Sequence, residues 1–487
     1  MPPLPTTALL DYLSTSAQRS QVEPIISEFN SFLTTKKHSD RPSTLAKVFP
    51  LVSRSCYLSP TVILTPITTQ VTQVLALTHV LGATFSIRGG GHLQDPGFNS
   101  NDGGIVISFC KGEFTQLILS GDKKTVNIGV GLRWADVYER LHEHGLAAAG
   151  RREPRVGVAG LLLGGGLSYQ CNEVGVGCMG QWTDGIWVVL ADSTIVHANK
   201  NENPDLFWAL KRGGPNCGKI INVTMTTLSN TLWSENLLMA NQTLIESDNK
   251  ASLIYDTVND RKFFTFTYLG PVKDGCPGIF MPFQHTPYMR YLVSPARRTV
   301  LEMANGVADV LESEKLLYAN PVSVFLFCLY YYKCLPSRRA SSTGSSRVAS
   351  LADLDRADLT MVIQPMFPFS VKAANDRGGN SFGLNCAGQQ IFLILADYTN
   401  PTDAPRVQAA MRKIVDTVDE VAKKNGSYLP FRYANYAAPD QDPLASYGKN
   451  LSRLREIAEK YGPEGVFQVL QNRGWLVSRA GLRREDK

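Results

Sequence analysis

The sequence predicts an α+β protein with two main lobes. The chain has 487 residues, more than one ordinary domain holds, and 44% of them are apolar. The stretch 62–88 has the pattern strand, amphipathic helix, strand and runs into three glycines. From about residue 230 to 425 glycine is rarer, and strand patterns alternate with long helix patterns. We therefore expect a glycine-rich first lobe and a separate second lobe of strands and helices.

The first lobe should open with a β-α-β unit. Strands are expected near residues 62 and 85, and one helical face between them is formed by Val71, Val74, Leu75, Leu77 and Leu81. A hairpin-rich part should follow, in which Gly145 closes a helix. The other expected elements of this lobe are strands over 103–109 and 125–131, a helix over 133–145, a hairpin over 186–198 and a strand over 219–228.

The second lobe should contain strands near residues 263 and 391. Helices are expected over 297–313 and 403–424. The segment 321–350 joins an aromatic run to "PSRRASSTGSSR", which has the composition of a linker, so we expect an insertion loop there. Helical periodicity also occurs over 21–47.

Composition excludes several classes of function. The net charge of +6 is spread along the chain, which gives little support for a nucleic-acid surface. No run of about 18 apolar residues occurs, so no membrane span is expected. The N-terminus lacks the pattern of a secretory signal, which makes a cytoplasmic location the default expectation. The nine cysteines show no zinc-type spacing, so we expect free thiols and no metal site.

Two glycine segments carry the chemical signal. "RGGGH" covers residues 88–92, and "LGGGLS" covers residues 163–168. Glycine allows backbone N–H groups to approach phosphate oxygens closely and allows a positive φ. Neither segment fits the Rossmann fingerprint or the P-loop, and a plain turn is the alternative for each taken alone. Two such segments about 70 residues apart, each after a strand-like run, favour a different kind of dinucleotide site.

Over residues 50–475 the chain resembles the berberine bridge enzyme-like flavoproteins. The family motif R-S-G-G-H corresponds to "RGGGH", and its second glycine motif corresponds to "GVAGLLLGGGLS" over 157–168. The stretch "NPDLFWALKRGGPNCG" and the late "YANY" also match. The resemblance implies a two-subdomain PCMH-type FAD-binding domain and a substrate domain whose antiparallel sheet is covered by helices.

The resemblance also implies the domain limits. They are an N-terminal helical segment over 1–50, the FAD-binding domain over 51–230, the substrate-binding domain over 231–425 with its insertion near 321–350, a C-terminal segment over 426–475 that returns to the FAD domain, and a polar tail over 476–487.

FAD is the cofactor that the resemblance implies, with one covalent link from His92 to the 8α-methyl of the flavin. A neutral imidazole is nucleophilic near pH 7, which makes that bond plausible; the alternative is a loop histidine that only bonds the backbone. Some relatives have a second, cysteine tether at the position of Gly157, where this chain has no thiol. The implied cofactor-binding residues are Arg88, Gly89, Gly90, Gly91, His92, Gly97, Gly157, Val158, Gly160, Leu163, Gly164, Gly165, Gly166, Leu167, Ser168, Gly218, Ile220, Tyr433 and Asn435.

Tyr433 is the candidate proton acceptor or orienting hydroxyl, although its phenol needs a nearby cation to ionise near neutral pH. Asn380 is the second candidate catalytic residue: it stands in the region where plant relatives place a glutamate base, although an amide cannot replace that base. The implied function is hydride transfer from a small-molecule substrate to FAD, with O2 as the electron acceptor, in fungal secondary metabolism. A non-redox cyclase that holds FAD only structurally is the alternative. A monomer or a weak homo-oligomer is expected.

Overall fold

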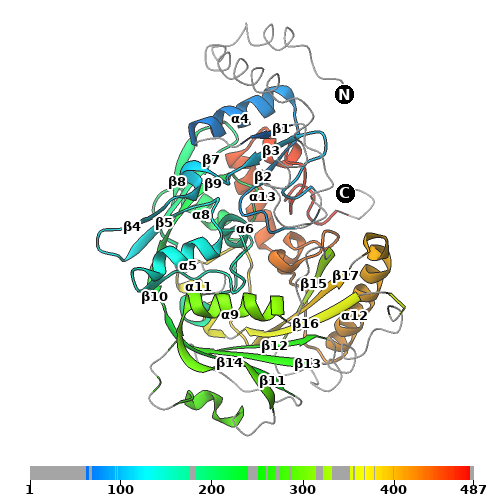
Figure 1. Cartoon of the computed structure of the whole chain (residues 1–487). Coiled ribbons are helices and arrows are strands. Elements are labelled where there is room, and N and C mark those ends of the chain that lie inside the picture. The colour runs from blue at the N-terminus through cyan, green and yellow to red at the C-terminus, as the bar shows by residue number, and fades with distance from the viewer. Residues whose placement is uncertain are drawn as a thin grey trace, which may run out of the picture.

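A computed structural model describes the greater part of the chain (Figure 1). The described residues are 62–64, 68–93, 95, 97–175, 182–239, 251–258, 261–269, 272, 275–283, 288–313, 322–331, 351, 353–354, 357–366, 368–377, 379–398 and 400–482. The expected N-terminal helical segment lies outside these residues. In the part of the chain that is described, no helix is long and apolar enough to cross a bilayer.

The first lobe holds a three-stranded and a five-stranded sheet. Its strands are β1 (Val62–Leu64), β2 (Phe85–Arg88), β3 (Ile105–Ser108), β4 (Leu117–Leu119), β5 (Thr125–Gly129), β6 (Leu146–Ala147), β7 (Trp182–Val189), β8 (Ile195–Ala198), β9 (Lys219–Thr226) and β10 (Leu228–Ser229). The orders are β1-β3-β2 and β4-β5-β9-β7-β8, and β6 pairs with β10. Its helices are α4 (Thr68–Leu81), α5 (Trp134–His142), α6 (Val158–Leu163), α7 (Cys171–Val174) and α8 (Pro204–Leu210).

The second lobe is built on one eight-stranded antiparallel sheet, in the order β14-β11-β13-β12-β16-β17-β15-β18. The strands are β11 (Thr231–Met239), β12 (Ala251–Val258), β13 (Arg261–Tyr268), β14 (Tyr288–Thr299), β15 (Val322–Tyr331), β16 (Ala357–Met366), β17 (Gln389–Tyr398) and β18 (Tyr428–Leu429). The helices after residue 230 are α9 (Val300–Ser313), α11 (Pro368–Asp376), α12 (Ala404–Lys424), α13 (Asn450–Tyr461) and α14 (Val466–Val469).

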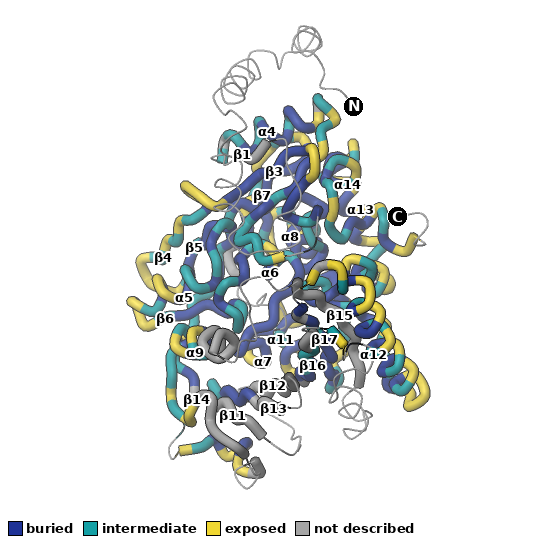
Figure 2. Tube along the Cα trace, turned by 45° about the vertical axis from the view of Figure 1, so that its right-hand side comes forward, coloured by how far each residue is buried: buried dark blue, intermediate teal, exposed yellow. Residues whose placement is uncertain are grey.

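The large sheet is covered on both faces at β17. Successive residues of β17 point to opposite faces, because the side-chain period of a strand is two. Ile391 and Leu393 belong to the buried cluster of the first lobe, whereas Phe392 and Ile394 belong to a second cluster that includes Val415 of α12. Helix α12 therefore covers one face, and the first lobe packs against the other. Figure 2 shows the buried residues continuing from the first lobe toward β16 and β17.

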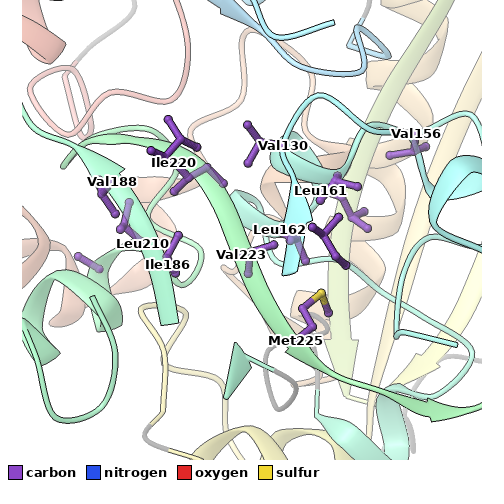
Figure 3. Packing of buried hydrophobic residues seen from close by; sticks show 14 of the residues in the cluster. Val130, Val156, Leu161, Leu162, Ile186, Val188, Leu210, Ile220, Val223 and Met225 are labelled. Atoms are coloured by element: carbon purple, nitrogen blue, oxygen red, sulfur yellow. The ribbon is translucent and has the colours of Figure 1, made fainter. Parts of the chain in front are cut away.

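The core behind the second glycine segment is apolar. In Figure 3, Leu161 and Leu162 of α6 lie in one cluster with Val223 and Met225 of β9. All four side chains are at most 3% exposed. This packing fixes α6 on the five-stranded sheet and so fixes the position of the glycines that follow it.

Two expectations about the first lobe are wrong. The strand expected in a hairpin over 103–109 is β3, which lies between β1 and β2 and pairs in parallel with both, because the connection from β2 to β3 is a crossover and not a tight turn. The run before the second glycine triplet is the short helix α6 rather than a strand, since Val158, Leu161 and Leu162 repeat at helical spacing on its buried face.

Two expectations about the later chain also need correction. Residues 322–331 do not begin an insertion loop: they form β15, which pairs along its whole length with β17. The expected insertion over 332–350 lies outside the described residues. The tail expected from residue 476 is packed as far as residue 480, because Leu476, Val477 and Ala480 are buried and Arg455 donates to the carbonyls of Val477 and Ala480.

Candidate active site

The two glycine segments touch each other at Gly90 and Gly157. A Cβ atom on Gly157 would lie 2.6 Å from the Gly90 nitrogen, and a Cβ on Gly90 would lie 2.4 Å from the Gly157 Cα. Arg133 holds this contact, because its Nε donates to the Gly90 carbonyl at 3.2 Å and its backbone bridges Gly157. Neither position has room for a side chain. The glycine that stands where relatives have a second tether is therefore required by packing, not only chosen for the absence of a thiol.

The first glycine loop is shaped from beneath by Arg88, at the end of β2. The Arg88 side chain is buried, donates to Asn99 Oδ1 at 3.2 Å and lies 2.4 Å from where a Cβ on Gly91 would be. Gly91 has a φ of +70°, which a residue with a side chain rarely adopts. The Arg88 guanidinium therefore supports the loop from inside the fold, and its contact with the cofactor stays a prediction.

Gly97 closes the same loop. Its N–H donates to Ser100 Oγ at 3.0 Å, and its carbonyl accepts from Ser86 and from Asn472. A Cβ at this position would lie 2.8 Å from Arg473 Cδ. Gly97 thus helps to anchor the loop, and its role in cofactor binding stays a prediction.

His92 stands beside Glu153. Its Nδ1 lies 3.8 Å from Glu153 Oε2, and neither buried atom makes a hydrogen bond. Burial lowers the pKa of His92 to about 4; Glu153 opposes this shift, while Arg151, Arg155 and Arg133 add to it. The side chain is still 34% exposed, so the ring can be reached from outside. The structure therefore provides a neutral, accessible imidazole whose buried nitrogen has no hydrogen-bond partner.

The second glycine segment turns sharply after α6. Gly165 and Gly166 have φ of +115° and +66°, which explains why the turn needs glycine. Gly164 leaves no room for a side chain, because its Cβ would overlap Asn435 Oδ1. Asn435 Nδ2 donates to the Leu161 carbonyl at 3.0 Å and so fixes the C-terminal segment on α6.

The other expected cofactor-binding residues differ in whether their surroundings are open or packed. A Cβ on Gly160 would meet nothing within 4 Å, and Leu163 on the same helix is half-buried, so this side of α6 is open. Gly89 faces the Val130 carbonyl and Ala159. The rest lie inside the fold: Val158, Leu167 and Ser168 are buried, and Gly218 and Ile220 pack against β7.

These features fit a flavin cofactor. The open side of α6 at Gly160 offers space next to a backbone that carries no side chain, and the unpartnered His92 Nδ1 lies on the neighbouring loop. Gly89, Gly160, Leu163 and His92 are the residues that would contact the cofactor. In the described residues, no group of three or more His, Cys, Asp or Glu could hold a metal ion.

An aromatic group covers the second glycine turn. The Phe382 ring lies edge-on to Tyr433, with 5.9 Å between centroids, and stacks under the Arg212 guanidinium at 4.0 Å. A Cβ on Gly165 would contact all three of these side chains. Asn380 lies beside them: its Oδ1 accepts from the Phe382 N–H at 2.9 Å and from Arg212 at 3.4 Å. Asn380 therefore positions this turn and, as expected for an amide, offers no proton acceptor.

The pKa values of Tyr433 and Tyr436 are shifted in opposite directions. Burial is the main reason why the pKa of Tyr433 is raised, and its hydroxyl accepts from Asn435 at 3.1 Å. Burial would also raise the pKa of Tyr436, but the charges of Arg151 and Arg152 outweigh it and lower that pKa. The two guanidiniums donate to the Tyr436 hydroxyl at 2.8 and 3.1 Å. The expectation that Tyr433 accepts a proton is therefore disfavoured.

Several residues of this site were not found from the sequence. Glu153, Arg151 and Arg152 all lie in "GRREPR", directly before the second glycine motif, and Tyr436 ends "YANY". Arg152 also donates to Gln364 of β16 at 3.0 Å, which links the site to the large sheet. The density of arginine in "GRREPR" was the available signal, and only the fold shows that it faces Tyr436 and His92.

Comparisons with known proteins agree with this arrangement. The FAD binding domain family matches residues 60–199, and the "Berberine and berberine like" family matches residues 432–472. The first range contains both glycine segments, and the second contains the Tyr433–Tyr436 stretch. Asn435 joins the two ranges, because its Nδ2 donates to the Leu161 carbonyl of α6. The chain therefore has an FAD-binding domain and is an FAD-dependent enzyme.

Relatives cover almost the whole chain. An FAD-dependent monooxygenase of Arthrobotrys oligospora is 33% identical over 449 residues, which span 88% of this chain and 84% of the relative. One from Aspergillus niger is 31% identical over 88% of this chain and 74% of its own length.

Solved structures share the fold. A 6-hydroxy-D-nicotine oxidase of Arthrobacter nicotinovorans has a TM-score of 0.70 at 19% identity, covering 88% of this chain and 95% of its own. A glucooligosaccharide oxidase of Acremonium strictum, whose FAD is 6-S-cysteinyl and 8α-N1-histidyl, has a TM-score of 0.70 at 18% identity, covering 90% and 97%. By its relatives, its two matched domains and its fold, the chain belongs to the berberine bridge enzyme-like family of FAD-dependent oxidoreductases.

Proposed function

We propose that this enzyme oxidises a small phenolic secondary metabolite, with O2 as the electron acceptor. The observation that carries the proposal is the charge of the site. Four positive charges act on His92 or Tyr436, those of Arg133, Arg151, Arg152 and Arg155. Glu153 is the negatively charged group that acts on His92. A region with this excess of positive charge favours a substrate that binds as an anion, and a phenol ionises readily in such a field.

The arginines are held in place by partners on three segments. Tyr436 accepts from both Arg151 and Arg152, and Gln364 of β16 accepts from Arg152. Arg151 also lies 4.8 Å from the centre of the Tyr436 ring. Both arginines are partly exposed, whereas Tyr436 is 1% exposed. In the proposal Arg152 and Arg151 bind the phenolate oxygen, and Tyr436 is a positioning residue that aligns them.

When bound, FAD supplies the two-electron oxidation by accepting a hydride and delivering the electrons to O2. The chain contributes binding and orientation. His92 is proposed as the single covalent anchor, since its ring is neutral and its side chain is 34% exposed. A second tether at Gly157 is not proposed, because the contact with Gly90 leaves no space for it. The relatives named monooxygenases support the use of O2.

Anaerobic mixing with a phenol and with its methyl ether tests the proposal. Loss of the visible flavin absorbance with the phenol, and much weaker binding of the ether, are the expected results. Product formed without any loss of flavin absorbance would instead mean a non-redox cyclisation. In air, labelled O2 distinguishes an oxidase, which releases hydrogen peroxide, from a monooxygenase, which leaves labelled oxygen in the product.

A further inference from the structure

We infer that Glu153 drives the covalent attachment of the flavin to His92, by balancing the charge that forms on the imidazole and accepting its proton. This inference rests on the proposed anchoring at His92 and adds a residue to it. Glu153 would be a positioning and proton-accepting residue for cofactor attachment, with no part in substrate oxidation.

The geometry points to Glu153 because one of its oxygens is held and the other is not. Arg155 Nε donates to Oε1 at 2.7 Å, and the Arg155 backbone N–H lies 3.4 Å from the same oxygen. Oε2 is buried, makes no hydrogen bond and faces the equally unpartnered His92 Nδ1 at 3.8 Å. Two buried polar atoms without partners cost free energy, which an interaction between them would recover. The carboxylate is therefore fixed in orientation with its reactive oxygen toward the imidazole.

Attachment makes the imidazole cationic for a time. One imidazole nitrogen forms a bond to the 8α-carbon, the methyl group loses one proton, and the imidazole loses another. Two electrons pass into the flavin and then to O2, which is the oxidant and yields hydrogen peroxide. The protein must therefore stabilise a positive charge on His92 and take up its proton.

Without Glu153 the surroundings of His92 would oppose that charge. Burial and the three guanidiniums of Arg151, Arg155 and Arg133 all disfavour the imidazolium, and Glu153 is the group that favours it. The same environment keeps the ring neutral, and thus nucleophilic, before the reaction. His92 must be neutral before the bond forms and cationic directly afterwards, and the negative charge of Glu153 stabilises the cationic form.

The test uses full-length protein isolated without flavin from a riboflavin-limited host. FAD is added in air, samples are denatured at intervals, and the flavin fluorescence that stays with the protein is measured. Glu153→Gln keeps the shape but removes the negative charge, and Glu153→Asp restores the charge. Glu202→Gln is a matched control, because Glu202 pairs with His197 at 3.1 Å at β8.

We expect Glu153→Gln to slow attachment by about a hundredfold, the size typical of lost general base catalysis. The rate in this variant should rise with pH, because water and hydroxide must take the proton. Glu153→Asp should recover most of the rate, and Glu202→Gln should match the wild type. Reversible FAD binding, followed by flavin fluorescence quenching, should be unchanged in all variants.

Attachment in Glu153→Gln at the wild-type rate would overturn the inference. So would equal slowing in Glu153→Asp and Glu153→Gln together with weakened FAD binding, since that indicates a purely structural role. Absence of any covalent flavin in the wild type would overturn both this inference and the anchor at His92. The proposed oxidation would stand apart from that result, because anaerobic flavin reduction by the substrate measures it independently.

Discussion

The contact between Gly90 and Gly157 predicts a specific loss of stability in Gly157→Ala. The new Cβ would lie 2.6 Å from the Gly90 nitrogen and 2.7 Å from its Cα, whereas ordinary contacts begin at 3.4 Å. The loops must separate by about 0.8 Å, and both colliding atoms are backbone. Overpacking of this kind costs about 1–3 kcal/mol.

The backbone conformation of Gly157 does not add to this cost. Its φ of −72° and ψ of 146° are ordinary for alanine. Replacing glycine by alanine would by itself stabilise the protein by about 0.4–1 kcal/mol through the unfolded chain. The net loss ranges from about 0 to about 2.6 kcal/mol, and its midpoint of about 1.3 kcal/mol lowers the Tm of a lobe of 150–250 residues by roughly 3–5 °C.

Differential scanning calorimetry of the flavin-free protein measures this change, reported as a Tm shift because a protein with two lobes need not unfold in one step. Gly160→Ala is the control: its Cβ would meet nothing within 4 Å, and it lies inside α6, so the Tm should stay the same or rise. A Tm for Gly157→Ala equal to or above that of the wild type would refute the packing argument.

Further predictions concern Tyr436 and His92. Tyr436→Phe removes the acceptor shared by Arg151 and Arg152, so the KM for a phenolic substrate should rise about tenfold or more while kcat changes little; an unchanged KM would contradict the positioning role. Because the pKa of His92 is lowered to about 4 in the folded state from 6.5, the unfolded chain binds more protons between these values. Stability should therefore fall as the pH drops from about 6.5 to about 4. Thermal unfolding across this range should show a smaller pH effect in His92→Asn, and equal pH slopes would contradict the shift.

Much of the first lobe could be predicted because local sequence dictates it. The helical face around Val74 and Leu75 gave α4, and the alternation in "TVNIGVG" gave β5. The pairing of β3 could not be predicted, since parallel and antiparallel strands have the same local pattern and differ only in the connection. The strand β15 at 322–331 could not be predicted for a related reason. An aromatic run alone does not distinguish a strand from a loop, and the pairing with β17 decides between them.

The candidate site shows the same division. The backbone conformation of the glycine turns could be predicted from the sequence, because runs of glycine indicate a positive φ. Gly91, Gly165 and Gly166 adopt it. The roles of the side chains could not be predicted, because they depend on neighbours that are distant in sequence. The contact of Arg88 with Asn99 is visible only in the folded chain. Tyr433 and Tyr436 likewise differ only because Arg151 and Arg152 lie beside Tyr436.

The central claim is that one flavin is anchored to this chain through His92 alone. Acid precipitation of the purified wild-type protein, followed by proteolysis and mass spectrometry of the yellow peptide, tests it most directly. We predict that the colour stays with the precipitated protein, that the flavin mass is found on the peptide containing His92 and on no other, and that His92→Ala releases all flavin on precipitation. Flavin left in the wild-type supernatant, or a flavin mass on a different residue, would contradict the account.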